Sequence, residues 1–412
     1  MSNEILNKER KINFFSITNF SVLLIFLSGF LSPEVILCLQ VITLIFILKK
    51  INLPLSFVFA LVILMVQSLV TILLGTDSFG LFIKQYIGIV FSCIYWLAVI
   101  RYDNIFNIIY IYICWCKIVA TVAIFQYIMS ILGFESLSNI GWLIKSQINT
   151  SGGRSAAFFS EPSECALILF PVIFLILYKF FGKYKKEIKD LVSIKASIVI
   201  LLGYLSTMSS VGFIGILISF IFILIEYKFN WRQIVVIVVA VISILILYNR
   251  VDFFQQRVND TFGIISNTQF ISKSNLSTQT LILNEEVAIK SFQKTFGLGG
   301  GLGSHEVSYN KYITDFDIED VQLFLNKEDA NSLLLRMISE IGLIGIIIII
   351  SFFVKYKIKR KKDINLSFII FQKMILAYMM LRFIRFGHYF NCGLFLFLIM
   401  YYRLYYSEKY HH

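Results

Sequence analysis

Long runs of apolar residues alternate with shorter polar segments along most of the chain. These runs cover residues 12–31, 34–48, 54–74, 79–100, 104–132, 164–181, 196–208, 211–226, 233–249, 331–353, 364–383 and 389–406. An α-helix needs about 20 mostly apolar residues to cross a bilayer. The runs at 34–48 and 196–208 are shorter than this. The pattern predicts an all-α polytopic membrane protein with about 12 transmembrane helices, in which residues 1–412 form a single integral membrane domain.

Two polar connections are much longer than the others and cover residues 133–163 and 250–330. The second separates the ninth and tenth predicted spans. Long connections without regular structure are uncommon in compact domains and usually carry function. Apolar residues within 278–296 recur as on one face of a helix, which predicts a short amphipathic helix near the membrane surface.

Composition supports the membrane class, because 58% of the 412 residues are hydrophobic and only 15% are charged. Soluble domains average about half apolar and a quarter charged residues. The net charge of +12 is unevenly distributed. If both termini are cytoplasmic, basic residues prevail in the cytoplasmic segments and acidic residues in the outer ones, as the positive-inside rule requires. Both long connections then lie outside, 250–330 as a large outer loop, and the charge implies no nucleic-acid partner.

The stretch 152–169 leads from the first long connection into the sixth predicted span. It carries Arg154, Glu161 and Glu164 immediately before and within the start of the apolar run. Pro162 is well placed to begin a helix, because the amide that proline lacks would have no helical partner there. The stretch therefore predicts a polar outer helix end, with Arg154 just ahead of it.

Arg336 and Glu340 lie four residues apart at the start of the tenth predicted span. This spacing is typical of an intrahelical ion pair. Charged residues inside membrane spans are also functional candidates. The sequence is thus equally consistent with an ion pair and with Arg336 facing the same outer cavity as Arg154.

Arg382, Arg385 and His388 recur every three residues at the outer end of the eleventh predicted span. The spacing predicts that they share roughly one helical face. Basic residues outside oppose the positive-inside bias, which indicates an anionic ligand. Arginine suits phosphate because its planar fork donates paired hydrogen bonds. The alternative is contact with ordinary lipid headgroups.

No familiar catalytic or metal-binding motif occurs, and the six cysteines lack zinc-site or disulfide spacing. A general base must reach its proton directly or through one water. Glu161, Asp329 and His388 are the candidates, with Glu161 the first choice. The glycine-rich segment 297–304 lacks the ending of a nucleotide-binding loop and favours a tight turn or hinge over the cavity.

Four local patterns together resemble the O-antigen and polysaccharide polymerases (Wzy) and the related O-antigen ligases. They are Arg154 with the Glu-Pro-Ser sequence ending at Ser163, Leu-Ser-x-x-Ser-Ser-x-Gly over 205–212, the glycine-rich segment 296–304, and Ala-Asn-Ser-Leu with the Glu-x-Gly-Leu-x-Gly that follows over 330–345. The resemblance also covers the helix count and the single long late loop, and so extends over most of the chain.

This resemblance implies a glycosyltransferase of GT-C-like fold that needs no metal or cofactor. It would act at the periplasmic face of a bacterial inner membrane on glycans carried by undecaprenyl pyrophosphate. The growing chain would pass to the non-reducing sugar of another lipid-linked repeat unit. Arginines would hold the pyrophosphate, and we expect Arg154, Arg336, Arg382 and Arg385 to do so. A chain-length regulator protein is a further expected partner.

Two other functions remain open at this point. An O-antigen ligase would transfer the glycan to lipid A–core, but the ligases resemble one another in a histidine where this chain has Ala330. A polysaccharide flippase or other transporter tends to have related halves with a site at the midplane. Here the polar groups gather at one face and one loop dominates, which favours an enzyme.

Overall fold

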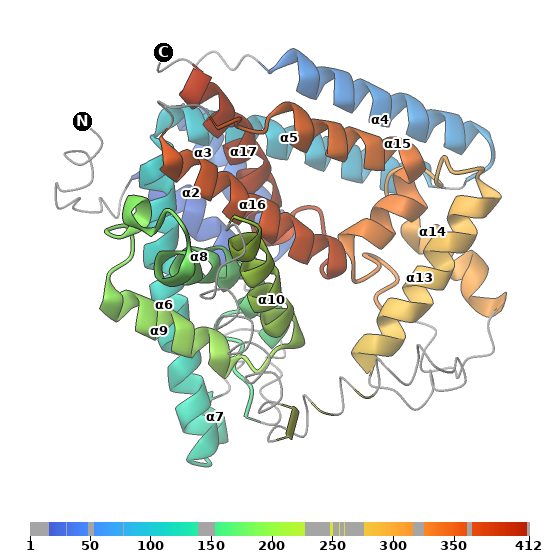
Figure 1. Ribbon diagram of the computed structural model, residues 1–412. Helices are drawn as coiled ribbons and strands as arrows, with labels where there is room; N and C mark the ends of the chain where they lie inside the picture. Colours follow the sequence, from blue (N-terminus) through green and yellow to red (C-terminus); the bar gives the residue numbers. More distant parts are fainter. Residues whose placement is uncertain are drawn as a thin grey trace.

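The computed structural model describes residues 16–29, 31–47, 53–76, 78–138, 153–226, 276–315, 325–360 and 365–409, with a few single positions between 248 and 259. Every regular element in these ranges is a helix (Figure 1). The longer helices are α2 (Ile17–Phe26), α3 (Pro33–Ile47), α4 (Leu55–Leu73), α5 (Phe79–Tyr102), α6 (Ile105–Ile131), α8 (Pro162–Phe181), α9 (Ile194–Ser206), α10 (Ser210–Ile225), α13 (Leu276–Lys294), α14 (His305–Tyr312), α15 (Leu333–Lys355), α16 (Leu366–Ile384) and α17 (Leu394–Lys409). The short elements are α7 (Glu135–Ser138), η2 (Lys185–Ile188), η4 (Ile313–Asp315) and η6 (Asn391–Gly393).

Six helices in the described ranges, α4, α5, α6, α8, α15 and α16, are long and apolar enough to cross a membrane. Four further apolar helices, α2, α3, α9 and α10, are shorter than a full span. The chain is therefore an α-helical protein with the composition of a multi-pass membrane protein. The expected count of 12 spans is not confirmed, and the predicted run 233–249 lies almost entirely outside the described residues.

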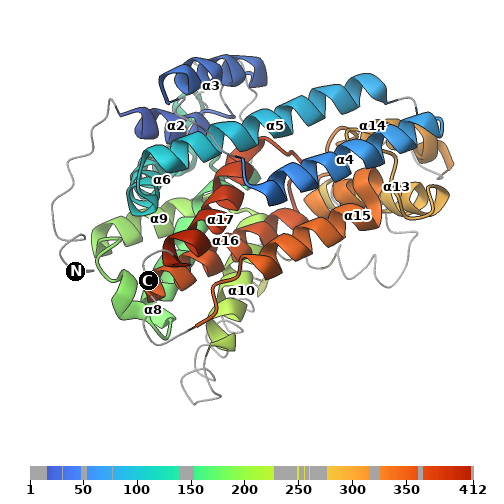
Figure 2. The same ribbon diagram turned by 90° about the horizontal axis from the view of Figure 1, so that it is seen from above.

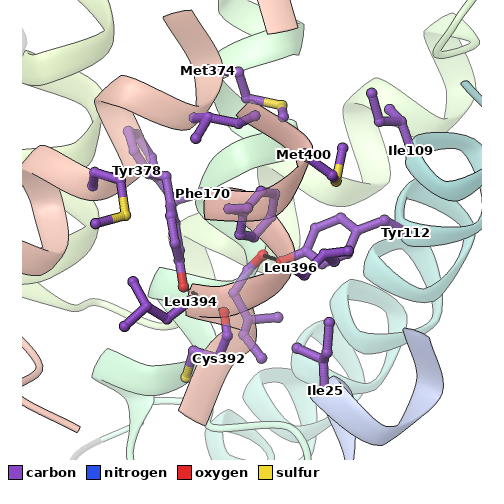
Figure 3. Close-up of a cluster of buried hydrophobic side chains, with 14 of the residues drawn as sticks. Ile25, Ile109, Tyr112, Phe170, Met374, Tyr378, Cys392, Leu394, Leu396 and Met400 are labelled. Carbon is purple, nitrogen blue, oxygen red and sulfur yellow. Dashed lines mark hydrogen bonds between the residues drawn. The ribbon is translucent and has the colours of Figure 1, made fainter. Parts of the chain in front are cut away.

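Helix α8 is the centre of the bundle, and nearly all of its side chains are buried. It is apolar on every face, as a helix surrounded by others must be. It packs against α6, α9, α10 and α16. Figure 3 shows its Phe170 among Tyr112 of α6, Met374 and Tyr378 of α16 and the start of α17. This core holds the first turn of α8, and the segment before it, in a fixed position.

Helices α4, α5 and α15 lie side by side along one flank of the bundle (Figure 2). Helix α15 is interrupted at Gly342, whose φ of 54° and ψ of −146° are not helical. The glycine-rich segment after α13 fills this break. Gly300 N donates to Ser339 O (2.8 Å) and Gly301 N to Glu340 O (2.7 Å), and Leu343 N donates back to Gly297 O (2.9 Å).

The helix predicted over 278–296 is present as α13. With α14 it forms a layer against α15 at one side of the bundle (Figure 1). The glycine-rich segment, expected to form a tight turn or a hinge over the cavity, forms turns that bond to α15 and α4. In α4, Ser68 Oγ accepts from Leu302 N (3.0 Å). A Cβ on Gly299 would lie 2.6 Å from the Glu340 backbone, so this close packing requires glycine.

Candidate functional site

One cavity of about 350 Å³ opens where five segments distant in the sequence meet. Its size is within the range of small-molecule sites. It lies at the start of α8, α10 and α13, before α15 and after α16. The residues that line it are Arg154, Glu161, Pro162, Ser163, Ser209, Ser210, Val211, Leu276, Ser277, Thr280, Leu325, Asn326, Asn331, Arg385 and Phe386. Three of the sequence-predicted site residues, Arg154, Glu161 and Arg385, are therefore brought together.

Of the three helices that begin at this cavity, α8 and α10 have a described N-cap residue. Helix α8 starts at Pro162 after the N-cap Glu161, and α10 starts at Ser210 after the N-cap Ser209. The first amides of a helix have no partner within it, and its N-terminal end carries partial positive charge. Neither N-cap side chain accepts a hydrogen bond from these amides. Both helix starts therefore favour an anion in the cavity.

Ser209 adds an unusual polar group. Its side chain is buried, with 3% exposure, and the described residues offer its hydroxyl no hydrogen-bond partner. A buried hydroxyl without a partner costs free energy. Ser209 lines the cavity, so a rotation of its side chain would let a ligand there supply the missing hydrogen bond.

Two guanidinium groups give the cavity its charge. Arg385 is buried, and its Nη1 donates to Ser277 O at 3.2 Å, which links the end of α16 to the start of α13. Burial lowers the pKa of both Arg154 and Arg385, and the nearby Glu161 carboxylate opposes the shift. Arginine stays protonated under such shifts. Among the described lining residues Glu161 is the sole carboxylate, so this described lining carries net positive charge.

The two glutamates at the start of α8 have different tasks. Glu164 Oε2 accepts from Ser160 N (3.2 Å) and Ser160 Oγ (2.6 Å), and so holds the turn before the helix. Glu161 is exposed, and its Oε2 accepts from Ser163 Oγ at 2.7 Å. Because Glu161 does not bond to the helix amides, it is free to face a ligand.

Asp329 lies behind the cavity wall in the loop before α15. Its side chain is buried, and Oδ1 accepts from Asn331 N (3.1 Å) and Asn326 Nδ2 (3.3 Å). Oδ2 lies 3.3 Å from Nε2 of His388, whose side chain is 46% exposed. The two residues that donate to Oδ1, Asn326 and Asn331, line the cavity, whereas Asp329 and His388 are not among the lining residues.

Several residues in this wall have strained backbone conformations. Among residues other than glycine, Asn326, Ala330, Asn331 and Phe386 all have positive φ, between 50° and 70°. Such conformations cost of order 1–3 kcal/mol each and cluster at functional sites. Phe386 N donates to Asn331 O at 3.0 Å, which fastens the two strained segments together.

Arg336, a predicted pyrophosphate ligand, does not line the cavity. Its Nε lies 2.8 Å from Glu340 Oε1 in a fully buried ion pair, and its Nη1 donates to Gly387 O at 3.2 Å. Tyr389 donates to Glu340 Oε2 at 2.8 Å, and its ring lies 4.3 Å from the guanidinium. The structure therefore shows Arg336 in the intrahelical ion pair and not facing the cavity. These groups are called the Arg336 network below.

A buried histidine continues the network. His305 of α14 has Nδ1 2.7 Å from Ser339 Oγ and Nε2 2.9 Å from Asn284 Oδ1. Burial lowers the pKa of His305 to about 3, so it is neutral. Both ring nitrogens are occupied, and His305 therefore has a structural role.

The guanidinium of Arg382 also donates its hydrogen bonds to the protein itself. Its Nη1 donates to Tyr378 Oη (3.1 Å) and Asn391 O (2.6 Å), and its Nη2 donates to His388 O. The expectation that Arg382, Arg385 and His388 share a helical face is wrong. Helix α16 ends at Ile384, and Arg385 is extended, with φ −140° and ψ 154°.

Sequence reasoning missed Gln126, near the end of α6. Its Nε2 donates to Ala157 O (3.0 Å), and its Oε1 accepts from Ala156 N (3.2 Å) and Ala157 N (2.7 Å). It thus supports the turn between Arg154 and Glu161, where Ala157 has a φ of 49°. A polar amide within a long apolar run is the sequence signal that points to such a residue.

No group of three or more His, Cys, Asp and Glu residues in the described ranges is placed to hold a metal ion. The cavity's arginines, hydroxyls and helix amides form a donor set for an anion. The chain matches no protein-family model, and no match was found among curated proteins.

Proposed function

We propose that this chain is a polysaccharide polymerase, a glycosyltransferase that moves a growing glycan from undecaprenyl pyrophosphate to the non-reducing end of another lipid-linked repeat unit. The observation that carries the proposal is the cavity of two arginines at two helix N-termini, set among apolar helices. A lipid-linked pyrophosphate needs such a combination, with donors for the diphosphate and a bilayer for the carrier.

In this proposal Arg154 and Arg385 hold the donor pyrophosphate. As the bond from the sugar to the pyrophosphate breaks, negative charge grows on the departing oxygen. Two fixed guanidinium groups and the amides of α8 and α10 stabilise that charge without rearranging. Ser209 and Ser210 lie where they can add hydrogen bonds to phosphate oxygens. Glu161, Asp329 and His388 are the candidates to take the proton of the acceptor hydroxyl.

Arg336 and Arg382 have an indirect role in this scheme. Each donates to a backbone carbonyl of the segment after Arg385, at Gly387 and His388. They fix the chain that carries a ligand-facing arginine. This division replaces the expectation that four arginines bind pyrophosphate.

The charge pattern of the sequence supports a location in a bacterial inner membrane, with the cavity on the periplasmic side and both termini in the cytoplasm. A polymerase in this position would draw its energy from the pyrophosphate bond of the donor. A chain-length regulator would be a fitting partner.

The test uses a strain in which a plasmid supplies the only copy of this chain. Arg154→Ala should abolish long-chain polymer on gels without lowering the protein level, whereas Arg403→Ala, an exposed arginine on α17, should not. Normal polymer from Arg154→Ala would refute the site. Loss of the chain should leave single repeats attached to their final acceptor. If nothing is attached, the protein is a ligase.

Purified protein provides the second part of the test. Lipid-linked repeat units extracted from cells that lack the chain should form polymer with this protein alone, without an energy source. Movement of these units across a vesicle membrane without polymer formation would instead identify a transporter.

A further inference from the structure

The geometry points to His388, oriented by Asp329, as the general base that removes the proton from the acceptor hydroxyl. This inference rests on the proposed transfer reaction and assigns a role that sequence reasoning left open among three residues. It depends on the exposure of each candidate, on its hydrogen-bond partners and on its position relative to the cavity arginines.

Asp329 is unsuited to act alone. Its side chain is 5% exposed, and Oδ1 is held by Asn326 and Asn331. Oδ2 faces the His388 ring. With both oxygens occupied and water excluded, the carboxylate cannot meet a substrate proton within hydrogen-bond reach, as a general base must. Its position suits the orientation of a histidine.

His388 has the complementary properties. Its Nε2 lies 3.3 Å from Asp329 Oδ2, and nearly half of its side chain is exposed. With Nε2–H directed at the carboxylate, Nδ1 keeps its lone pair and can accept a proton. A buried carboxylate that orients a histidine and stabilises its protonated form is the arrangement by which histidine bases are activated.

The backbone on both sides of the imidazole is fixed. Arg336 Nη1 donates to Gly387 O, and Arg382 Nη2 donates to His388 O. A Cβ on Gly387 would overlap the carbonyl oxygen of Asp329, so the main chains carrying acid and histidine are in direct contact. Two buried arginines therefore hold the backbone that carries the imidazole.

Glu161 lies on the wrong side for this task. It lines the cavity with Arg154 and Arg385, and its charge acts on both guanidinium groups. In a single displacement the nucleophile approaches the sugar on the face opposite the leaving group, so base and leaving group must be apart. Asp329 and His388 are not among the lining residues, and Asp329 is joined to the lining through Asn326 and Asn331.

The groups present account for every bond and proton in the glycan transfer. The acceptor hydroxyl gives its proton to His388 Nδ1, and its oxygen forms a bond to the anomeric carbon of the donor glycan. The bond from that carbon to the pyrophosphate breaks, and its electron pair leaves with the pyrophosphate between Arg154 and Arg385. The charged groups that face the imidazole are Asp329, Glu328, Arg336 and Arg382.

The test combines activity with a titration of the imidazole. With purified full-length protein and lipid-linked repeat units extracted from cells that lack it, His388→Gln should lower kcat by about 100-fold with little change in KM. Asp329→Asn should lower kcat by about 10-fold, whereas Asp190→Asn, the same change at an exposed residue between η2 and α9, should not lower it. A His388→Gln variant that retains wild-type kcat would overturn the inference.

The titration needs no substrate. The rate at which diethyl pyrocarbonate modifies His388, followed by mass spectrometry of its peptide, reports the neutral fraction at each pH. Burial lowers the pKa of His388 and the Asp329 carboxylate raises it. Asp329→Asn should therefore move the midpoint to lower pH, and the acidic limb of kcat/KM with it. An unmoved midpoint refutes the dyad. A wild-type protein that forms no polymer refutes the proposed function, and the inference with it.

Discussion

The cavity and the Arg336 network lie next to each other, and both contain arginine, carboxylate and hydroxyl groups. In the network, Arg336, Glu340 and Tyr389 satisfy one another, with no water needed. In the described lining of the cavity, the charges of Arg154 and Arg385 outnumber the single charge of Glu161, and the Ser209 hydroxyl has no partner in the described part of the chain. A satisfied polar group stabilises the fold, whereas an unsatisfied one at a cavity indicates a ligand.

The largest effect should follow from breaking the network. Arg336→Met leaves the Glu340 carboxylate buried without its counter-ion, and loss of one partner of a buried pair costs about 3–5 kcal/mol. The thermal midpoint of the purified protein should fall accordingly. The double change Arg336→Met with Glu340→Met removes both charges and should recover much of this loss. Equal destabilisation of single and double variants would contradict the pairing.

Arg385→Ala should have the opposite effect, with a large loss of activity and little loss of stability. This side chain bonds to the fold through Ser277 O alone in the described ranges, so the thermal midpoint should change little. Removal of a donor that stabilises transition-state charge should lower the rate of polymer formation about 10²–10³-fold. Rates are measured on lipid-linked repeat units, with Arg403→Ala as the control. A large fall in stability with an intact rate would assign Arg385 to the network instead.

Gln126→Leu should combine both kinds of effect at intermediate size. It leaves the amides of Ala156 and Ala157 and one carbonyl without their partner, which costs about 2 kcal/mol. The turn that carries Arg154 should loosen, so that the affinity for inorganic pyrophosphate falls as well. Thr121→Val on the same helix removes an exposed hydroxyl bonded to Lys117 O and is the matched control. An unchanged midpoint for Gln126→Leu would contradict its supporting role.

The sequence allowed the helices and the polar start of α8 to be predicted, because apolar period and proline position are local properties. The same holds for α13. The sequence could not distinguish arginines that line the cavity from arginines that bond to the protein itself. The partners of Arg382 are carbonyls of the turn after α16, and no sequence spacing reveals backbone carbonyls as ligands.

The shared face expected for Arg382, Arg385 and His388 failed for a related reason. Helical spacing was extended past Ile384, where the chain leaves the helix and Phe386 adopts a φ of 70°. That conformation is maintained by a bond from Phe386 N to Asn331 O, more than 50 residues away in the chain. The site is thus built by tertiary contacts that override the local pattern.

The smallest predicted effect tests the difference between the cavity and the Arg336 network most directly. It contrasts two buried serines, one at the N-cap of α10 and one within the helix. Ser219 Oγ donates to Gly215 O at 3.0 Å, whereas Ser209 Oγ has no partner in the described ranges. Ser209→Ala should leave the thermal midpoint unchanged or raise it, since it removes an unsatisfied group. The same change should weaken the binding of inorganic pyrophosphate about 5-fold, which is about 1 kcal/mol. Ser219→Ala should lower the midpoint slightly and leave binding intact. If Ser219→Ala weakened pyrophosphate binding as much as Ser209→Ala did, the missing partner of Ser209 would not be the ligand.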